Sequence, residues 1–524
     1  MKKITLLILF ISSAVFSQTE QTLNYAWAFP TKVNNKIVFV RTEPNFGTEL
    51  WVSDGTEAGT TILMDIIPGN ASSNPFNLTA IDNVIYFTVN DHQIWRTDGT
   101  TVGTYNMITN PNITNVGGFI KANNFIFFHE GTTGSSGIRN IWRMQTTPNS
   151  AVEVLQATNQ SFQNVDRGFY NLDDDNLLIN VRTLAHGWSI WRTNGLVSEL
   201  VKDLNPTNAS DRVQMSSVKK IDNTIYFLGF TIENGNEPFT TNGTTPETIL
   251  LKDIFVSNNY FDTSGATNFY KVGNIIYFTA KDNTNGLELW KTNGTAAGTE
   301  MIKDITPGNN SNSWSPNSFI EFNNQLYFSK NDEINGSQIW KSDGTNDGTV
   351  MVTSNPQTTF YGNQLIKYNN LLFYSAYNQT NGVELWMLDS DDNATLVQDI
   401  TPGNEGSDPG DFIELNGYLY FMASTNGNAT GRKIFRLNSQ TLETNSSKNN
   451  TISVYPNPAN GIFHIENTVE NQLEYTVYDQ NGKKINLSQN GDTIDISNQA
   501  SGIYFLKIFN ATQNIVSIKK IIKH

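Results

Sequence analysis

A tandem repeat runs through most of the chain and limits its fold more than any other feature of the sequence. The segment 49–56, Glu-Leu-Trp-Val-Ser-Asp-Gly-Thr, returns with few changes around Trp95, Trp290 and Trp340. Weaker copies centre on five more aromatic residues: Trp142, Trp191, Phe239, Trp386 and Phe435. From Trp51 to Phe435 the nine anchors recur about every 48 residues, a period typical of one supersecondary unit in a repeat architecture.

Each unit contains four short strand-like runs separated by turn residues. In the unit around Trp290 the runs are residues 268–272, 275–280, 288–292 and 300–305. Apolar runs such as Leu371-Leu372-Phe373-Tyr374 hardly alternate with polar residues, as expected when both faces of a strand are buried. Four strands in about 48 residues is the blade unit of a β-propeller.

We therefore predict an all-β fold in which residues 22–440 form a large β-propeller of about nine four-stranded units. A ring of eight blades, with the divergent Trp142 unit displaced, is an alternative, and so is an open β-solenoid. A closed ring removes exposed sheet edges, so we expect the ninth unit to pack on the first, near residues 25–33. Its fourth run, 441–444, is weak and polar, and we expect the outer strand there to be short.

The repeats resemble the ELWxxDGT family, which occurs in exported bacterial proteins and is expected to form propellers. The resemblance is specific around Trp51, Trp95, Trp290 and Trp340. It is degraded around Trp142, where Met144-Gln145 replaces Asp-Gly, and around Phe239 and Phe435. It implies a fold and an exported protein, but no single activity.

Several repeated residues could serve either structure or ligand binding. The tryptophans are expected to fill the space between blades, and the Asp-Gly pairs to form tight turns. Asp65, Asp304 and Asp399 each begin an Asp-Ile-x-Pro-Gly motif at the end of a fourth run. Such aspartates commonly cap the following turn, although a ring of carboxylates could also bind cations or sugar hydroxyls.

The connections between runs are expected to differ between the two faces of the ring. Those between the first and second runs, and between the third and fourth, share one face and are short and uniform. The opposite face carries longer connections, such as 281–287, 330–337 and 307–317, and binding sites occur disproportionately on such loops. Trp314 lies in the last of these. The candidate ligand-binding residues are therefore Trp314, Asp65, Asp304 and Asp399.

Catalytic and metal-binding signals are sparse. The chain has no cysteine. His92, His129 and His186 lie in different units and lack the spacing of metal ligands. The acidic runs 173–175 and 389–393 resemble calcium loops but lack their glycine and closing glutamate. We expect no catalytic residue and no cofactor, with calcium as the one alternative.

The overall charge narrows the class of partner. The net charge is −15 at pH 7, and a field of this sign repels phosphate backbones and anionic lipid. No segment after the N-terminal apolar run is long enough to span a membrane. Neither nucleic acid nor membrane insertion is expected.

The N-terminus has the three-part form of a secretory signal. Met1-Lys2-Lys3 is basic, residues 4–11 are mostly apolar, and Val15-Phe16-Ser17 offers tolerated residues for cleavage. We predict that residues 1–17 are a signal peptide and that the protein is exported through the periplasm.

The C-terminal segment has a different texture. Residues 441–450 read as a polar linker, and 451–524 as a small β-sandwich with turn signals between short strands. Val454-Tyr455-Pro456-Asn457-Pro458, the run 502–508 and the basic Lys519-Lys520 resemble the type A sorting domain of the type IX secretion system. The resemblance implies recognition by that machinery, passage through the outer membrane, and secretion or attachment at the cell surface.

Two functions fit these features. The leading hypothesis is a non-catalytic binding or adhesion protein that uses the variable loop face of the propeller to bind protein or polysaccharide. The rival is an extracellular polysaccharide-degrading enzyme, a glycosidase or lyase, with carboxylates near the axis. Propellers host both kinds of function, so the fold does not decide between them.

Overall fold

The computed structural model describes residues 20–23, 28–109, 113, 115–131, 139–154, 162–183, 185–206, 215–257, 259, 261–308, 315–332, 334–353, 358–360, 364–427, 432–437, 453–455, 457–466, 473–479, 483–485, 487–490, 493–510 and 515–524. The elements in these residues are β-strands, β1 to β45. The chain forms two compact units, one within residues 16–439 and one that includes residues 440–524.

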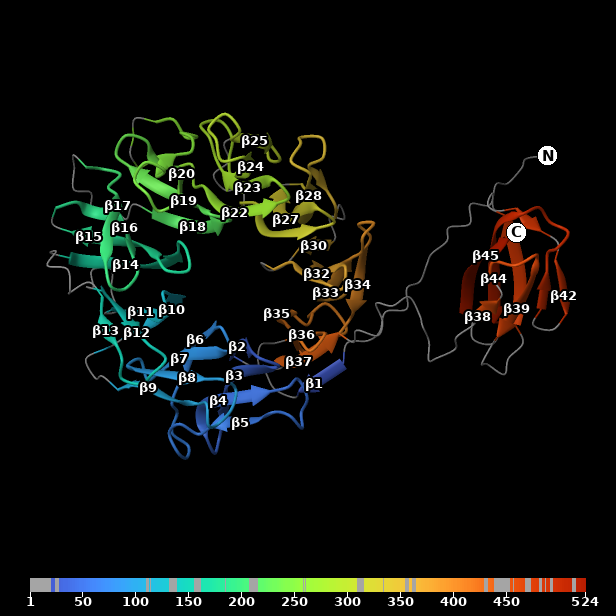
Figure 1. Ribbon diagram of the computed structural model, residues 1–524, viewed down its shortest axis with the longest axis horizontal. Coiled ribbons are helices and arrows are strands. Elements are labelled where there is room, and N and C mark those ends of the chain that lie inside the picture. The colour runs from blue at the N-terminus through green and yellow to red at the C-terminus, as the bar shows by residue number, and fades with distance from the viewer. Residues whose placement is uncertain are drawn as a thin grey trace. The chain divides into compact units, whose positions relative to one another are not determined.

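Nine antiparallel sheets make up the first unit in the part of the chain that the structure describes, and Figure 1 shows them arranged around a central opening. Blades one to three contain β2 (Ala28–Val33), β3 (Lys36–Glu43), β4 (Gly47–Ser53), β5 (Thr61–Met64), β6 (Phe76–Ile81), β7 (Val84–Val89), β8 (Gln93–Thr97), β9 (Tyr105–Thr109), β10 (Gly117–Ala122), β11 (Phe125–Gly131), β12 (Arg139–Met144) and β13 (Val152–Glu153). Blades four to six contain β14 (Phe162–Asn171), β15 (Leu177–Thr183), β16 (Gly187–Thr193), β17 (Ser198–Lys202), β18 (Met215–Ile221), β19 (Thr224–Thr231), β20 (Gly235–Thr241), β21 (Ile249–Leu250), β22 (Thr267–Val272), β23 (Ile275–Ala280), β24 (Glu288–Thr292) and β25 (Glu300–Lys303). Blades seven to nine contain β26 (Asn317–Phe322), β27 (Gln325–Asp332), β28 (Gly336–Ser342), β29 (Val350–Met351), β30 (Thr358–Phe360), β31 (Ile366–Tyr368), β32 (Leu371–Asn378), β33 (Gly382–Leu388), β34 (Ala394–Gln398), β35 (Gly410–Leu415), β36 (Tyr418–Ser424) and β37 (Arg432–Leu437).

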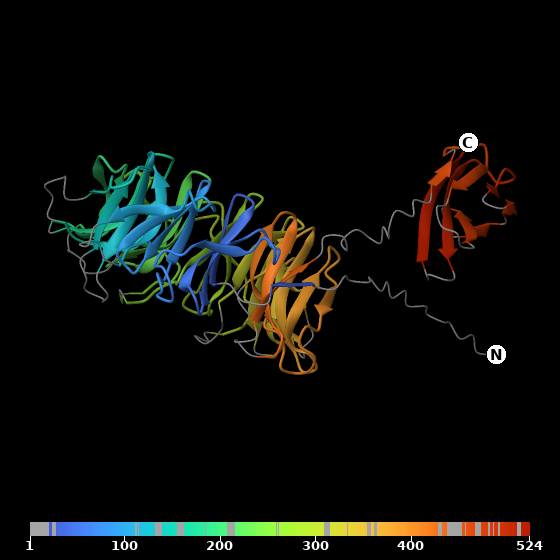
Figure 2. The same cartoon turned by 90° about the horizontal axis from the view of Figure 1, so that it is seen from below.

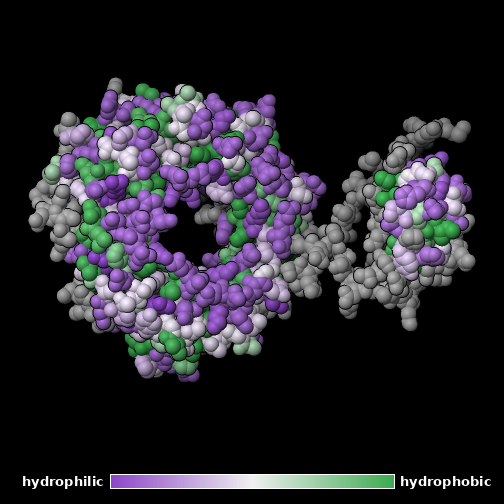
Figure 3. Space-filling view, in the orientation of Figure 1, coloured by the Kyte–Doolittle hydropathy of each residue, from purple (hydrophilic) through white to green (hydrophobic). Residues whose placement is uncertain are grey.

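In blades one to seven, each strand pairs with the next along the chain, whereas in blade eight β30 and β31 both pair with β32. The first strand of each blade borders the opening and the fourth lies at the outer rim, as β10 and β13 show in Figure 1. Figure 2 views the same blades from the edge of the ring, and Figure 3 shows that mainly hydrophilic residues surround the opening.

Adjacent blades pack face to face through apolar residues of their middle strands. One cluster joins Val38 and Leu50 of blade one to Ile85 and Phe87 of blade two. The repeated aromatic residues belong to this packing: Trp290 is 5% exposed and lies against Phe278, with ring centroids 6.2 Å apart. The prediction that these tryptophans pack in the core is confirmed. Wide rings suit the gap between radiating sheets, which no single sheet could fill.

The ring closes through both ends of the propeller sequence. Ile37 and Phe39 of blade one pack with Tyr420 and Ile434 of blade nine. The N-terminal strand β1 (Glu20–Leu23) pairs with β37 and supplies the fourth strand of blade nine.

The closure corrects one expectation and decides between alternatives. We expected the outer strand of blade nine, from the run 441–444, to stay short. That run lies outside the described residues, and β1 fills the edge instead, because an unpaired strand leaves backbone groups without partners. The Trp142 unit is an ordinary blade, β10 to β13, so the eight-bladed ring is wrong, and the closed ring excludes the open solenoid. The predicted loop 330–337 is also wrong, because β27 and β28 extend through it and leave only residues 333–335 between them.

The second unit is a β-sandwich of two four-stranded sheets in its described residues. Its strands are β38 (Ser453–Tyr455), β39 (Ile462–Glu466), β40 (Leu473–Asp479), β41 (Lys484–Ile485), β42 (Ser488–Asn490), β43 (Thr493–Asp495), β44 (Gly502–Asn510) and β45 (Ile515–Lys523). Phe463 and Ile494 of one sheet pack against Val477 and Leu506 of the other. The predicted sandwich is confirmed.

In the part of the chain that the structure describes, no helix is long and apolar enough to cross a membrane.

Candidate ligand-binding face

The two faces of the propeller are built from different connections. We call the face with the connections between strands one and two and between strands three and four the turn face. There, the Asn34 side-chain amide of blade one donates to the Asp98 carbonyl of blade two over 3.3 Å. The opposite face, with connections two to three and four to one, is the loop face. The predicted pairing of connections is confirmed by the close approach of Gly47, where β4 begins after the connection from β3, to Ala71, in the connection from β5 to β6. A Cβ on Gly47 would be 2.4 Å from the Ala71 carbonyl oxygen.

Turns on the turn face are stabilised by their own side chains. In blade seven the Asp343 carboxylate accepts hydrogen bonds from the Thr345 backbone N–H (2.9 Å) and hydroxyl (2.7 Å). The Thr345 hydroxyl accepts from Gly348 N–H, and the Ser342 and Thr349 hydroxyls lie 2.7 Å apart. The corresponding Asp-Gly-Thr or Asn-Gly-Thr segments of blades one, two and six repeat this network, and blade five repeats its bonds to Asn242 with Glu247 in the place of the glycine. The motif therefore makes turns, as predicted.

A buried glutamate stabilises the loop face. Glu237 and Glu384 are fully buried at the third strands of blades five and eight. Glu237 accepts from the backbone N–H of Ile254 (2.9 Å), and Glu384 from that of Thr401 (3.2 Å), both at the start of the long connection to the next blade. Burial raises the pKa of each carboxyl to about 7, although these hydrogen bonds oppose the shift. The glutamate of the repeat motif thus fixes the long loop on the ring.

Blade six has the same glutamate with a counter-ion. Lys330 of blade seven lies with its Nζ atom 3.3 Å from the Oε1 atom of Glu288, and both side chains are fully buried. The Lys330 ammonium also donates to the Leu287 carbonyl over 2.8 Å. At the strand position that Lys330 occupies in blade seven, blade six has Ala280 and blade nine has Ala423. This anchor was not among the predicted site residues, although the repeated Glu before Leu-Trp was a signal for it.

The structure places the predicted site residues in separate blades. Asp65 accepts from the Gly69 N–H over 3.2 Å, which is the capping role considered for it. Asp399 accepts from the Asn381 side-chain amide over 2.8 Å, across the loop face of blade eight. Asp304 begins the corresponding connection of blade six. The three aspartates do not form one site, and Trp314 lies outside the described residues.

Residues considered for metal binding are also apart. His92, His129 and His186 lie in blades two, three and four; the His186 Nδ1 atom is 3.3 Å from Asp203 Oδ2. Among the residues that the structure describes, no three histidine, aspartate or glutamate side chains are grouped as a metal site. Asp173 and Asp389, from the two acidic runs, each accept backbone N–H groups of their own turn. The absence of a cofactor stays a prediction, with calcium as its one alternative.

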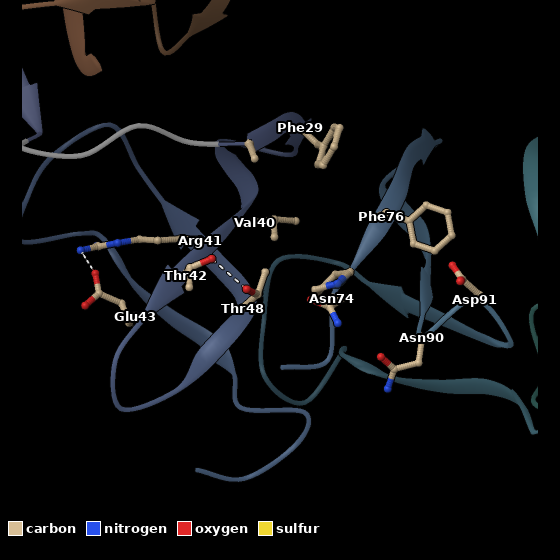
Figure 4. Close-up of a pocket in the computed structure, with 12 residues that line it drawn as sticks. Phe29, Val40, Arg41, Thr42, Glu43, Thr48, Asn74, Phe76, Asn90 and Asp91 are labelled. Atoms are coloured by element: carbon tan, nitrogen blue, oxygen red, sulfur yellow. Dashed lines mark hydrogen bonds and ion pairs between the residues drawn. The ribbon is translucent and has the colours of Figure 1, made fainter. Parts of the chain in front are cut away.

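A cavity of about 800 Å³ opens on the loop face between blades one and two (Figure 4). Two phenylalanines, Phe29 at the start of β2 and Phe76 at the start of β6, contribute aromatic surface to it. Polar side chains complete the lining: Arg41, Thr42, Glu43, Thr48, Asn74, Asn90 and Asp91. The volume lies in the range of small-ligand sites, while the lining is more polar than is usual for them.

Charge within this cavity is largely balanced. The Arg41 guanidinium pairs with the Glu43 carboxylate and lies over the Trp51 ring, 4.6 Å from its centroid. Thr42 and Thr48 hydroxyls are hydrogen-bonded over 2.8 Å. The sequence analysis did not find this cavity, since two blades have to meet before it exists.

Comparison with known proteins identifies the second unit. Residues 453–524 match the family model described as "Secretion system C-terminal sorting domain". The segment is a type IX sorting domain. The chain is therefore exported to the outer cell surface, and its sorting domain acts with the secretion machinery. No curated protein matches the chain.

Solved structures resemble the chain only distantly. PorZ, a surface component of the type IX secretion system of Porphyromonas gingivalis, is 11% identical, with 94% of this chain and 75% of that chain covered and a TM-score of 0.33. The β-propeller domain of the Trilobed protease from Pyrococcus furiosus is 14% identical, with 63% and 98% covered and a TM-score of 0.31.

Proposed function

We propose that this protein is a non-catalytic binding protein of the outer cell surface, which binds an extracellular polymer through the loop face of its propeller. The cavity between blades one and two is the observation that supports this proposal most directly. It lies where the connections differ from blade to blade, and such loops on a rigid scaffold are the common place for binding residues.

The scaffold beneath this face suits a binding role. Each long connection begins on a buried carboxylate in blades one, five, six and eight, so the loops start from fixed points. Fixed loops lose little conformational entropy on binding, which favours affinity. Polysaccharide and protein are both polymers that a protein at this location would meet.

The rival function is a polysaccharide-degrading enzyme. Two carboxylates, Glu43 and Asp91, line the cavity, as a glycosidase would require. However, the Glu43 carboxylate is already occupied by its ion pair with the Arg41 guanidinium.

The test is adsorption of the purified full-length protein to a panel of soluble and insoluble polysaccharides and matrix proteins. We expect saturable binding to at least one polymer, with no new reducing ends, no unsaturated sugar products and no loss of polymer length. Cleavage of the bound polymer that is lost in Asp91→Asn would establish the enzyme instead. Absence of binding to every polymer would contradict the proposal.

A further inference from the structure

Phe29 combines three properties that a purely structural phenylalanine would rarely combine. Its backbone φ is 53°, in the left-handed region that bulky side chains seldom occupy. Its side chain is 61% exposed. It borders the loop-face cavity near the first residue of β2 (Figure 4). Backbone strain and exposure both cost stability, so a binding role is a reasonable cause for retaining them.

The sibling blades show what the position otherwise requires. Phe29 lies in a β-bulge between Ala28 and Thr31, and six other inner strands have the same irregularity with a positive φ at the equivalent residue. Those residues are small or tolerate this conformation: Asn77, Gly118, Ser217, Asn268, Ser318 and Asp411. Asn77 and Asn268 also donate side-chain hydrogen bonds to the next blade, to Val116 O and Pro316 O. Blade one alone among these seven has an aromatic residue, which can make neither bond.

The surroundings of Phe29 match the chemistry of a sugar ring. Asn74, Asn90 and Asp91 supply amide and carboxylate groups that can bond hydroxyls, and Thr42 supplies a hydroxyl. An exposed aromatic ring offers a flat apolar surface for the C–H face of a pyranose. Arg41 is neutralised by Glu43, and Asp91 would repel an acidic sugar.

We propose that the cavity between blades one and two is a subsite for an uncharged polysaccharide, with Phe29 stacking on one sugar ring. This inference rests on the proposed function and names its ligand class. Asn74, Asn90 and Asp91 then orient the chain through its hydroxyls. No covalent step is involved.

The experiment uses full-length protein and two substitutions at this position. Phe29→Asn restores the residue type of blades two and six, so the backbone strain is relieved, and Phe29→Ala removes only the ring. Leu196→Asn is the matched control, because Leu196 is similarly exposed (60%) but lies in a turn-face connection of blade four. Soluble neutral glucans, mannans, xylans and galactans are titrated, with alginate and hyaluronate as acidic counterparts.

We expect both Phe29 variants to lose about tenfold or more in affinity for the neutral polymer that binds, the size of a lost aromatic contact with its buried area. The melting temperature of Phe29→Asn should equal or exceed that of the unaltered protein, and Leu196→Asn should bind normally. Retained binding in Phe29→Asn overturns the subsite while leaving polysaccharide binding established. Preference for alginate or hyaluronate, or for proteins alone, overturns the ligand class while the proposed binding function stands.

Discussion

The connections on the two faces of the propeller are stabilised in different ways. On the turn face, the side chains of a motif such as Asp343-Gly344-Thr345 bond within their own turn, and the Lys291 ammonium of the neighbouring blade donates to the Gly344 carbonyl over 2.9 Å. On the loop face, a buried glutamate such as Glu384 fixes the first residues of a connection whose remainder varies between blades. The turn face therefore has nearly the same structure in successive blades, whereas on the loop face the connections can differ from blade to blade.

The two kinds of connection explain why the blades differ from one another mainly on the loop face. Eight of the nine blades have a two-residue connection between strands one and two, and such turns need residues with positive φ, for instance Asn123 and Asn124. Sequence freedom there is small. The loop face has no such restriction after its anchor, and the cavity beside Phe29 lies there.

The largest effect is expected from Lys330→Ala, which removes the counter-ion of a loop-face anchor. Glu288 would remain buried and unpaired, and breaking a buried pair typically costs about 3–5 kcal/mol. Lys303→Ala is the control, because Lys303 donates to the Thr349 carbonyl at the turn face and is partly exposed. Denaturant unfolding should show a loss below about 1 kcal/mol for the control. Equal losses would remove the distinction between the faces.

A pH dependence of similar size should come from blades five and eight. An ordinary glutamate has a pKa of 4.5, whereas burial raises the pKa of Glu237 and of Glu384 to about 7. Between these values the folded state binds more protons than the unfolded state. The contribution of each carboxyl to the free energy of unfolding is therefore highest below about pH 4.5, falls as the pH rises towards 7, and is constant above it. The decrease is on the order of 3 kcal/mol for each group at most.

Unfolding by denaturant at pH 5 and pH 8 measures this decrease. Hydrogen bonds within the turns lower the pKa of Asp98 and Asp343, but these groups titrate below the window and oppose the trend only in stronger acid. Ala423→Lys, which places a lysine at the strand position that Lys330 occupies in blade seven, should supply a counter-ion to Glu384 and reduce the decrease. A protein that is more stable at pH 8 than at pH 5 would contradict the role given to these glutamates.

The smallest effect is expected on the turn face. Asp343→Ala removes two hydrogen bonds at an exposed position, so we expect a loss of about 1 kcal/mol and no change in polymer binding. Asp347→Ala, in the same turn, is the control and should be neutral. Loss of polymer binding in Asp343→Ala would show that the turn face also binds the ligand.

The repeat predicted the architecture because its residues act locally. Trp290 and Asp343-Gly344 have the same role in any blade, so their spacing alone reveals the unit and the number of blades. Strand β1 could not be predicted in the same way, since residues 20–23 belong to no repeat and pair with β37, which lies at the other end of the propeller sequence.

The candidate site was harder to predict for a related reason. Asp65, Asp304 and Asp399 were singled out by their motif, but a repeated motif is distributed around the ring and does not converge. Phe29 was visible as the aromatic exception to Asn77 and Asn268, yet this comparison requires the register of the inner strands, which the structure supplies.

Hydrogen–deuterium exchange of the full-length protein, with and without the neutral polysaccharide that binds it, tests the central claim most directly. The account predicts slower exchange on binding in peptides that cover residues 28–48 and 74–91, which line the loop-face cavity. Peptides covering the turns at 98–104 and 343–349 should exchange at unchanged rates. Protection confined to those turns, or to the sorting domain at 453–524, would contradict a binding site on the loop face.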